Sequence, residues 1–213
     1  MQKAIFNIQN ETDFERCALQ VFKHQFENNK VYRSFCDLLY IHPSDVKEVA
    51  QIPFLPIQFF KTHQILSTNQ SVQETFSSSG TTGTLVSKHL VTDTSWYEAS
   101  YTKAFEHFYG PVEDYTVLGL LPNYLEREGS SLIYMVDDFI QKSNKPKSGF
   151  YLDNLSELSK TLIALDRKGE KVLLIGVTFA LLDLIESQSF SLKNTVIMET
   201  GGMKGRRKEM IRE

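Results

Sequence analysis

Short apolar runs that alternate with segments of helical periodicity constrain the fold of this sequence more than any other feature. Each apolar run has the length of one buried strand, and the runs cover residues 115–121, 171–176 and 195–198. The segments that follow the spacing of amphipathic helices cover residues 130–141, 155–167 and 179–185. Strands that alternate with helices predict an α/β fold, with a largely parallel sheet flanked by helices.

The N-terminal part of the chain has a helical pattern instead. Thr12 and Glu15 have the spacing of a capping box, and the apolar residues that follow predict a helix over residues 12–28. A second helix is expected over residues 31–39, with an apolar side formed by Val31, Phe35, Leu38 and Leu39. Ser44 begins a turn or a short helix.

Residues 52–66 contain Pro53 and Pro56 among many aromatic side chains. Proline stops a regular helix, so an extended segment is expected here. The aromatic side chains could wall a pocket or pack in the core, and core packing is favoured. Together with the helices before it, this segment predicts a helical N-terminal cap over residues 1–70, followed by an α/β subdomain over residues 71–213.

A loop rich in hydroxyl groups lies between two predicted strands, residues 73–77 and 88–92, and a helix is expected over residues 94–109. The loop itself, residues 77–84, consists only of Ser, Thr and Gly. Glycine lets backbone N–H groups turn toward one anion, hydroxyl groups add further donors, and Lys88 can supply positive charge. The spacing is not that of a P-loop. A phosphate-binding loop and a flexible polar loop both fit this composition.

Composition excludes several classes of protein. Hydrophobic residues make up 41% of the chain, charged residues 23%, and the net charge is −3. This balance is that of an ordinary globular protein and does not favour nucleic acid or an anionic membrane as a partner. Because a secretory signal and a membrane-spanning run are both missing from the sequence, a cytoplasmic protein is expected. Cys17 and Cys36 lie in apolar stretches, which predicts buried thiols rather than a disulfide or a zinc site.

Several motifs together resemble one family. Residues 78–83, with the sequence Ser-Ser-Gly-Thr-Thr-Gly, are similar to the phosphate-binding signature of the adenylate-forming enzymes, such as acyl-CoA synthetases and phenylacetate–CoA ligases. The motifs that narrow the resemblance cover residues 53–61, 87–89, 121–127 and 199–206. In this order they resemble the bacterial acyl-protein synthetases of the LuxE type, and the similarity is expected from about residue 50 to the end of the chain.

The resemblance implies an ATP-dependent ligase. A carboxylic acid, expected to be a fatty acid, would attack the α-phosphate of Mg-ATP, and the acyl group of the resulting acyl-adenylate would pass to a thiol of a protein or of coenzyme A. ATP and Mg²⁺ are the implied cofactors, and an acyl-reductase-like protein is an implied partner. No residue is assigned to catalysis or to metal binding.

The resemblance also implies which residues bind the nucleotide. The Ser/Thr/Gly loop would hold the β- and γ-phosphates, the following lysine would be their cation, and two glycines near the end of the chain would lie against the adenine. These residues are Ser78, Ser79, Gly80, Thr81, Thr82, Gly83, Lys88, Gly201 and Gly202. In the basic cluster that follows, Arg206 could contact phosphate, whereas Arg207 is expected in a solvated turn.

The sequence contains only the first part of the family pattern. A downstream Tyr-Gly-x-Thr-Glu motif, which in the family binds Mg²⁺ and covers the adenine, is not found. The chain is therefore expected to be a partial N-terminal domain of an adenylate-forming enzyme, truncated at its C-terminal end. The alternative is a noncatalytic nucleotide- or partner-binding module of a split ligase.

Overall fold

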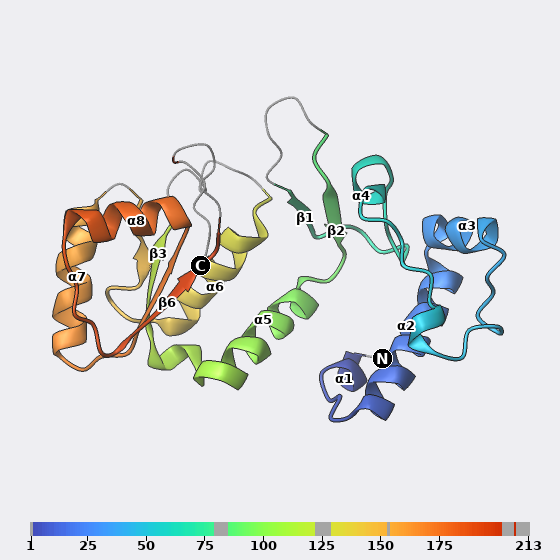
Figure 1. Cartoon of the computed structure of the whole chain (residues 1–213), viewed down its shortest axis with the longest axis horizontal. Coiled ribbons are helices and arrows are strands. Elements are labelled where there is room, and N and C mark those ends of the chain that lie inside the picture. The colour runs from blue at the N-terminus through green and yellow to red at the C-terminus, as the bar shows by residue number, and fades with distance from the viewer. Residues whose placement is uncertain (1, 79–84, 122–128, 153, 202–206, 208–213) are drawn as a thin grey trace. The chain divides into compact units, whose positions relative to one another are not determined.

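The computed structural model describes residues 2–78, 85–121, 129–152, 154–201 and 207. The chain divides into two compact units, Met1–Ser100 and Tyr101–Glu213 (Figure 1). The boundary predicted at residue 70 lies inside the first unit, which contains the strands on both sides of the Ser/Thr/Gly loop as well as the N-terminal helices.

The first unit begins with helical elements. They are α1 (Gln2–Ile5), α2 (Glu11–Asn28), α3 (Lys30–Leu38), the 3₁₀-helix η1 (Val49–Gln51) and α4 (Phe59–Thr62). The helix predicted over residues 12–28 is confirmed, but the predicted capping box is wrong, because Asn10 caps α2. The backbone N–H of Asp13 donates to the side-chain oxygen of Asn10 at 2.9 Å. Asparagine suits this position because its short side chain reaches the first-turn N–H groups.

The buried side of α3 differs from the predicted side. Tyr32 and Cys36 lie in the core, whereas Leu38 is 79% exposed, so the prediction is wrong at the C-terminal end of the helix. The prediction of buried thiols is confirmed, since both cysteines are free and buried. The core of this part of the first unit consists of Phe22, Phe26, Tyr32, Cys36 and Val46.

An antiparallel hairpin carries the Ser/Thr/Gly loop. It consists of β1 (Glu74–Ser77) and β2 (Lys88–Val91), with Ser77 opposite Lys88, which confirms both predicted strands. The pairing continues for one more residue, because the Ser78 N–H donates to the carbonyl of Ser87 at 3.0 Å. Helix α5 (Thr94–Tyr109) follows, with the predicted bounds.

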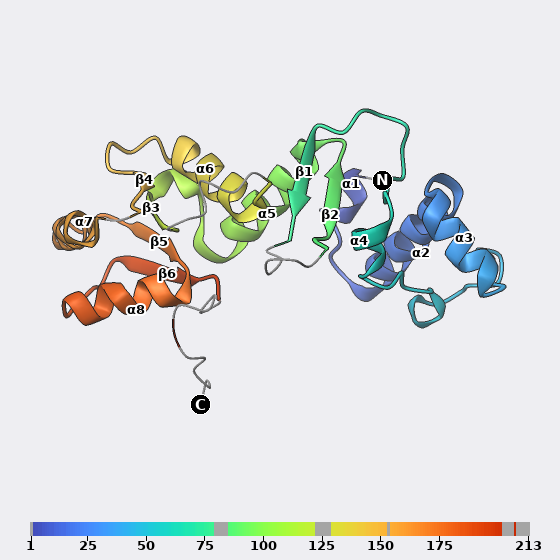
Figure 2. The ribbon, with the colours of Figure 1, turned by 90° about the horizontal axis from the view of Figure 1, so that it is seen from above.

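The second unit contains a four-stranded, all-parallel sheet in the order β4-β3-β5-β6. Its elements are η2 (Val112–Asp114), β3 (Thr116–Leu120), α6 (Ser131–Ser143), β4 (Gly149–Phe150), α7 (Leu155–Arg167), β5 (Val172–Gly176), α8 (Thr178–Ser187) and β6 (Thr195–Glu199). Helices α7 and α8 lie on one face of the sheet and α6 on the other (Figure 2). The predicted α/β fold with a parallel sheet flanked by helices is confirmed.

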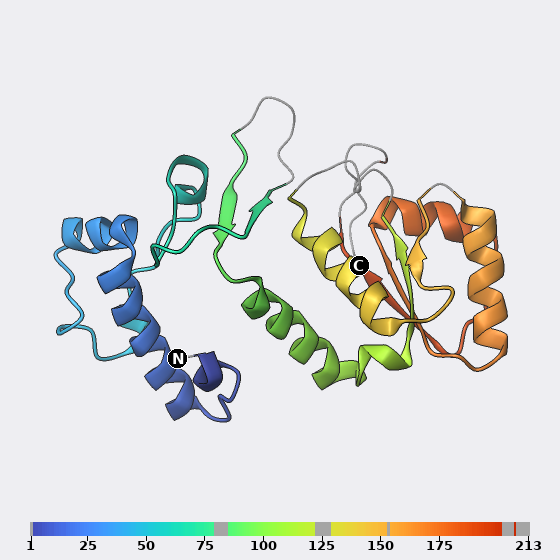
Figure 3. The ribbon, with the colours of Figure 1, turned by 180° about the vertical axis from the view of Figure 1, so that it is seen from behind.

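The core of the second unit lies between this sheet and its helices. Every residue of β3 and β5 is buried. Helix α6 covers β3 (Figure 3), and the ring of Phe139 in α6 meets the ring of Phe105 in α5 at 5.1 Å between centroids. Within the described parts of the chain, none of the helices has the length and apolarity needed to cross a bilayer.

Candidate functional site

The carboxyl ends of three parallel strands meet at one edge of the sheet in the second unit. Leu120, Gly176 and Glu199 end β3, β5 and β6, and the register pairs Leu120 with Gly176 and Gly176 with Glu199. In the strand order β4-β3-β5-β6, the connection after β3 leads to one side of the sheet and the connection after β5 leads to the other. The two connections therefore diverge between β3 and β5. In α/β sheets, ligands bind outside the carboxyl ends of the strands at such a point.

Two of the motifs that carry the family resemblance leave the sheet at this edge. The first begins at Leu121, directly after β3, and the second begins at Glu199 in β6. Residues 122–128 and 202–206 lie outside the described residues. The predicted adenine-binding residue Gly201 is described, whereas Gly202 is not. The structure therefore brings the start of both motifs to the carboxyl edge where a nucleotide site is expected.

Backbone hydrogen bonds extend the sheet past the end of β6. The N–H of Thr200 donates to the carbonyl of Gly176 at 3.0 Å, and the Thr200 hydroxyl donates to the same oxygen at 3.3 Å. These two bonds fix the chain immediately before Gly201. Gly201 has a φ of +72°, a left-handed conformation that glycine adopts without strain. A Cβ at this position would meet no atom of the described residues within 4 Å, so among them the space beside its backbone is open.

Thr178 and Glu199 connect the first turn of α8 to the end of β6. The hydroxyl of Thr178 donates to the carboxylate of Glu199. A negative charge next to the first residue of a helix is favourable because the helix N-terminus carries partial positive charge. Helix α8 lies close to β5 because residue 176 is glycine: a Cβ there would lie 2.9 Å from the side chain of Leu181.

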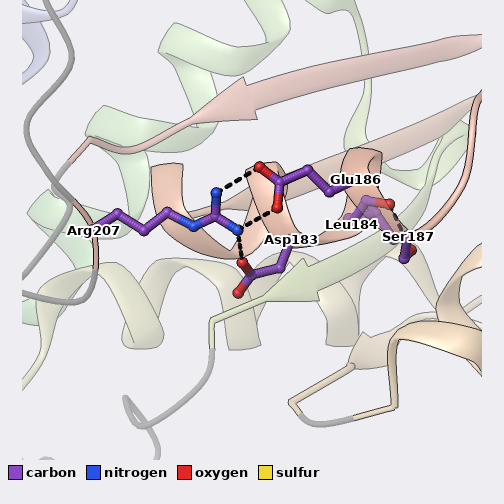
Figure 4. A network of polar contacts seen from close by, with 5 residues as sticks. All are labelled: Asp183, Leu184, Glu186, Ser187 and Arg207. Carbon is purple, nitrogen blue, oxygen red and sulfur yellow. Dashed lines mark hydrogen bonds and ion pairs between the residues drawn. The ribbon is translucent and has the colours of Figure 1, made fainter.

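Arg207 binds two carboxylates of α8 (Figure 4). Its guanidinium donates to both oxygens of Glu186, at 2.6 and 2.7 Å, and also to Asp183. The hydrogen bonds from Arg207 hold the pKa of the Glu186 carboxyl below its ordinary value, and the two acids raise the pKa of Arg207. The expectation of a solvated Arg207 is therefore wrong, because the side chain is held against α8.

Only the edges of the Ser/Thr/Gly loop are described. Ser78 closes the neck of the loop, since its hydroxyl oxygen accepts the N–H of Ser87 at 3.0 Å. Lys88 is exposed at the start of β2. The predicted phosphate-binding residues Ser79, Gly80, Thr81, Thr82 and Gly83 lie outside the described residues. Their role stays a prediction, as does that of Lys88.

Sequence reasoning missed two contacts, one at the sheet edge and one on helix α8. The pair of Thr178 and Glu199 joins residues that are far apart in the sequence, and Arg207 reaches α8 in the same way. The motif that begins at Glu199 was the signal in the sequence for this strand end, but Glu199 is exposed and its burial required no partner. Its partner follows only from the parallel pairing of β5 and β6.

Comparison with known proteins gives a match to one family model. Residues 4–99 match the model described as acyl-protein synthetase, LuxE. A long-chain-fatty-acid–luciferin-component ligase of Photorhabdus luminescens is 29% identical over 70 residues, which are 32% of this chain and 60% of that protein. The chain thus spans about 60% of the length of this curated relative. No solved structure matches the chain.

The matched part differs from the part in which the resemblance was expected. It begins at residue 4, well before residue 50, and it ends at residue 99, before the motifs at the edge of the parallel sheet. It includes the N-terminal helices, the segment of residues 53–61 and the Ser/Thr/Gly loop. Residues 4–99 of this chain are therefore similar to acyl-protein synthetases of the LuxE type, the family that the motifs in this part resemble.

Proposed function

We propose that this chain forms the nucleotide-binding part of a ligase that activates a fatty or other carboxylic acid with Mg-ATP and transfers the acyl group to a thiol. One observation carries the proposal: the loop of residues 78–83 lies within the part of the chain that matches the acyl-protein synthetases. The relative from Photorhabdus luminescens, named as a ligase of long-chain fatty acids, supports the choice of a fatty acid.

In the proposed reaction, an oxygen of the carboxylate attacks the α-phosphorus of ATP. The bond from this phosphorus to the bridging oxygen breaks, and pyrophosphate leaves. A thiolate then attacks the acyl carbonyl, and AMP leaves as the thioester forms. The first step brings two anions together, so positive charge and hydrogen-bond donors must screen the phosphates. Mg²⁺ bound to the phosphates would supply part of this charge.

The residues of the loop fit a polyphosphate. Glycines at residues 80 and 83 allow backbone N–H groups to point at one anion, and the serine and threonine hydroxyls add neutral donors. The Ser78 hydroxyl accepts the N–H of Ser87 and keeps its own hydrogen for donation to a phosphate oxygen. Lys88, exposed at the start of β2, would pair with the same group. We assign Ser78, Ser79, Gly80, Thr81, Thr82 and Gly83 to the β- and γ-phosphates.

At the edge of the parallel sheet, Gly201 and Gly202 would face the adenine. The open space beside Gly201 suits a flat ring that lies against the backbone. The bonds of Thr200 to the Gly176 carbonyl hold this stretch in place. The acyl acceptor would be a cysteine of a protein or coenzyme A, and an acyl-reductase-like protein could use the product.

The test is carboxylate-dependent exchange of [³²P]pyrophosphate into ATP. It is run with this chain and with the complete product of its gene, over a panel of fatty acids of different length. Ser79→Ala is compared with Ser71→Ala, which removes the same hydroxyl from an exposed residue outside the loop. We expect exchange that requires a fatty acid and that is weakened at least tenfold by Ser79→Ala alone.

Two results would overturn the proposal in different ways. ATP binding without exchange in either protein would leave a noncatalytic nucleotide-binding module, which is the alternative that the sequence left open. Equal exchange in Ser79→Ala and Ser71→Ala would contradict the role of the loop.

A further inference from the structure

A cavity of about 560 Å³ lies wholly within the first unit. Helix α2 forms one wall with Ala18 and Val21, the segment after η1 contributes Ile52 and Leu55, and Phe60 and Leu90 contribute from α4 and β2. A volume of this size falls in the range of sites for small molecules.

The cavity is lined mainly by aliphatic and aromatic side chains, and several of its polar groups are already paired. The side chain of Asn29 donates to that of Gln25 at 3.1 Å, and the hydroxyl of Tyr32 donates to the carbonyl of Pro53 at 2.7 Å. These groups need no ligand to satisfy their hydrogen bonds. An apolar ligand therefore loses little by entering, and it gains by leaving water.

The lining also includes residues of the hairpin that carries the Ser/Thr/Gly loop. His89 of β2 lines the cavity and directly follows Lys88. Ser67 and Thr68 add hydroxyl groups to the lining. An elongated ligand with an apolar tail and one polar end would thus find one polar side chain, that of His89, on the strand that leads out of the loop.

All residues that line the cavity, from Ile5 to Thr92, belong to the part of the chain that matches the acyl-protein synthetase family. We propose that this cavity binds the hydrocarbon chain of a long-chain fatty acid, with the carboxyl end toward His89. The inference rests on the proposed function for the identity of the ligand. Binding of the hydrocarbon chain can nevertheless be measured without ATP and without turnover.

The first test is equilibrium binding of cis-parinaric acid, a fluorescent fatty acid, followed by its displacement with saturated fatty acids of increasing length. Ala18→Trp places a large ring in the cavity, and Ala50→Trp makes the same change at an exposed residue that does not line it. We expect saturable binding that Ala18→Trp weakens at least tenfold and Ala50→Trp leaves unchanged. Each added CH₂ should tighten displacement by about fourfold until the cavity is filled.

A second test needs no variant and so does not depend on the folding of Ala18→Trp. Cys17 lines the cavity, whereas Cys36 lies in the core and does not. Alkylation by N-ethylmaleimide, mapped by peptide mass spectrometry, should slow at Cys17 when palmitate is bound and stay unchanged at Cys36. Equal rates at Cys17 with and without palmitate would overturn the proposal.

The two proposals fail separately. If pyrophosphate exchange depends on fatty acid but Ala18→Trp binds cis-parinaric acid as the wild type does, the proposed fatty-acid site is wrong and the proposed ligase activity stands. Saturable fatty-acid binding that Ala18→Trp abolishes, without any exchange, would keep the cavity and reject the ligase. Absence of saturable binding by the unmodified chain would reject the cavity in either case.

Discussion

The hydroxyl of Thr178, the first residue of α8, donates a hydrogen bond to the carboxylate of Glu199, the last residue of β6. The bond joins the segment that leaves β5 to the segment that leaves β6, at the carboxyl edge of the sheet next to Gly201. With the bonds from Thr200 to the Gly176 carbonyl, it fixes the direction in which the chain leaves β6. In the proposed site, the adenine would lie where the chain leaves β6.

Thr178→Val should weaken the proposed activation reaction. Valine keeps the shape of threonine but cannot donate to Glu199, so the turn before Gly201 loses one of its attachments. Small displacements of positioning groups cost on the order of tenfold to a hundredfold in rate. We expect a loss in this range in pyrophosphate exchange.

Thr102→Val in α5 is the matched control for Thr178→Val. Its hydroxyl accepts a hydrogen bond from the ammonium group of Lys142 at 3.1 Å and makes no contact with Glu199. We expect wild-type exchange in this variant. Equal rates in the two variants would show that the bond between Thr178 and Glu199 does not position the site.

Lys88→Met should weaken the binding of Mg-ATP. The variant keeps a long unbranched side chain and removes the cation next to the loop. A hydrogen bond to a charged group contributes enough for a loss of about tenfold or more in affinity. Titration calorimetry at low and at high salt measures both the loss and the weaker salt dependence. Lys47→Met, at another exposed lysine of the first unit, should behave like the wild type.

Gly201→Ala separates backbone strain from a role at the site. Gly201 and Gly169 have φ values of +72° and +73°, and a Cβ on either would meet no atom in the described parts of the chain within 4 Å. Alanine in this conformation costs about 1–2 kcal/mol, so both substitutions should lower the free energy of unfolding by a similar amount. Only Gly201→Ala should weaken ATP binding, because only there would the methyl group lie against the adenine.

Denaturant unfolding measures the free energy of unfolding of both glycine variants, and titration with ATP measures their affinity for the nucleotide. An equal effect of Gly201→Ala and Gly169→Ala on ATP binding would remove Gly201 from the proposed site.

Asp166 gives a prediction about the pH dependence of stability. Its buried carboxylate accepts the N–H groups of Asn194, at 2.7 Å, and Lys193, at 3.0 Å, and the hydroxyl of Thr195. The N–H of Asn194 contributes most to a pKa of Asp166 below its ordinary value. This contribution to stability is complete above the unfolded-state pKa of about 3.9 and is lost as the pH falls through the lower folded-state pKa.

Asp166→Asn should therefore lower Tm by roughly a few degrees at neutral pH, and the difference from wild type should shrink as the solution is acidified. The measurement is the Tm of the wild type and of Asp166→Asn at a series of pH values from neutral to acidic. Asp137→Asn, at an exposed acid of α6, should have almost no effect at any pH. A difference between Asp166→Asn and wild type that stays constant down to low pH would contradict this role.

The sequence predicted the regular elements where the pattern is strong. Helix α7 has the predicted bounds, because Gly169 stops it in a left-handed conformation, and β5 follows as the predicted buried strand. Strand β4 was not predicted, since the two residues Gly149 and Phe150 are too short to show any periodicity. Its place at the edge of the sheet comes from pairing with β3.

Local sequence could not predict which residues meet across the fold. Leu38 belongs to the apolar side of α3 by spacing, yet it is exposed, whereas Tyr32 and Cys36 of the same helix are buried. Asn10 takes the cap that was assigned to Thr12, since two competing capping residues lie within one turn. The contacts of Glu199 and Arg207 depend on tertiary structure alone.

The identity of the nucleotide product distinguishes activation of a carboxylic acid from hydrolysis of ATP. The chain, alone and in the complete product of its gene, is incubated with Mg-ATP, a long-chain fatty acid and hydroxylamine, and the products are identified by mass spectrometry. We predict that AMP, pyrophosphate and the acyl hydroxamate form only when the fatty acid is present, and that Ser79→Ala lowers the amount of all three. Formation of ADP and phosphate, or nucleotide turnover that is independent of the fatty acid, would contradict this prediction.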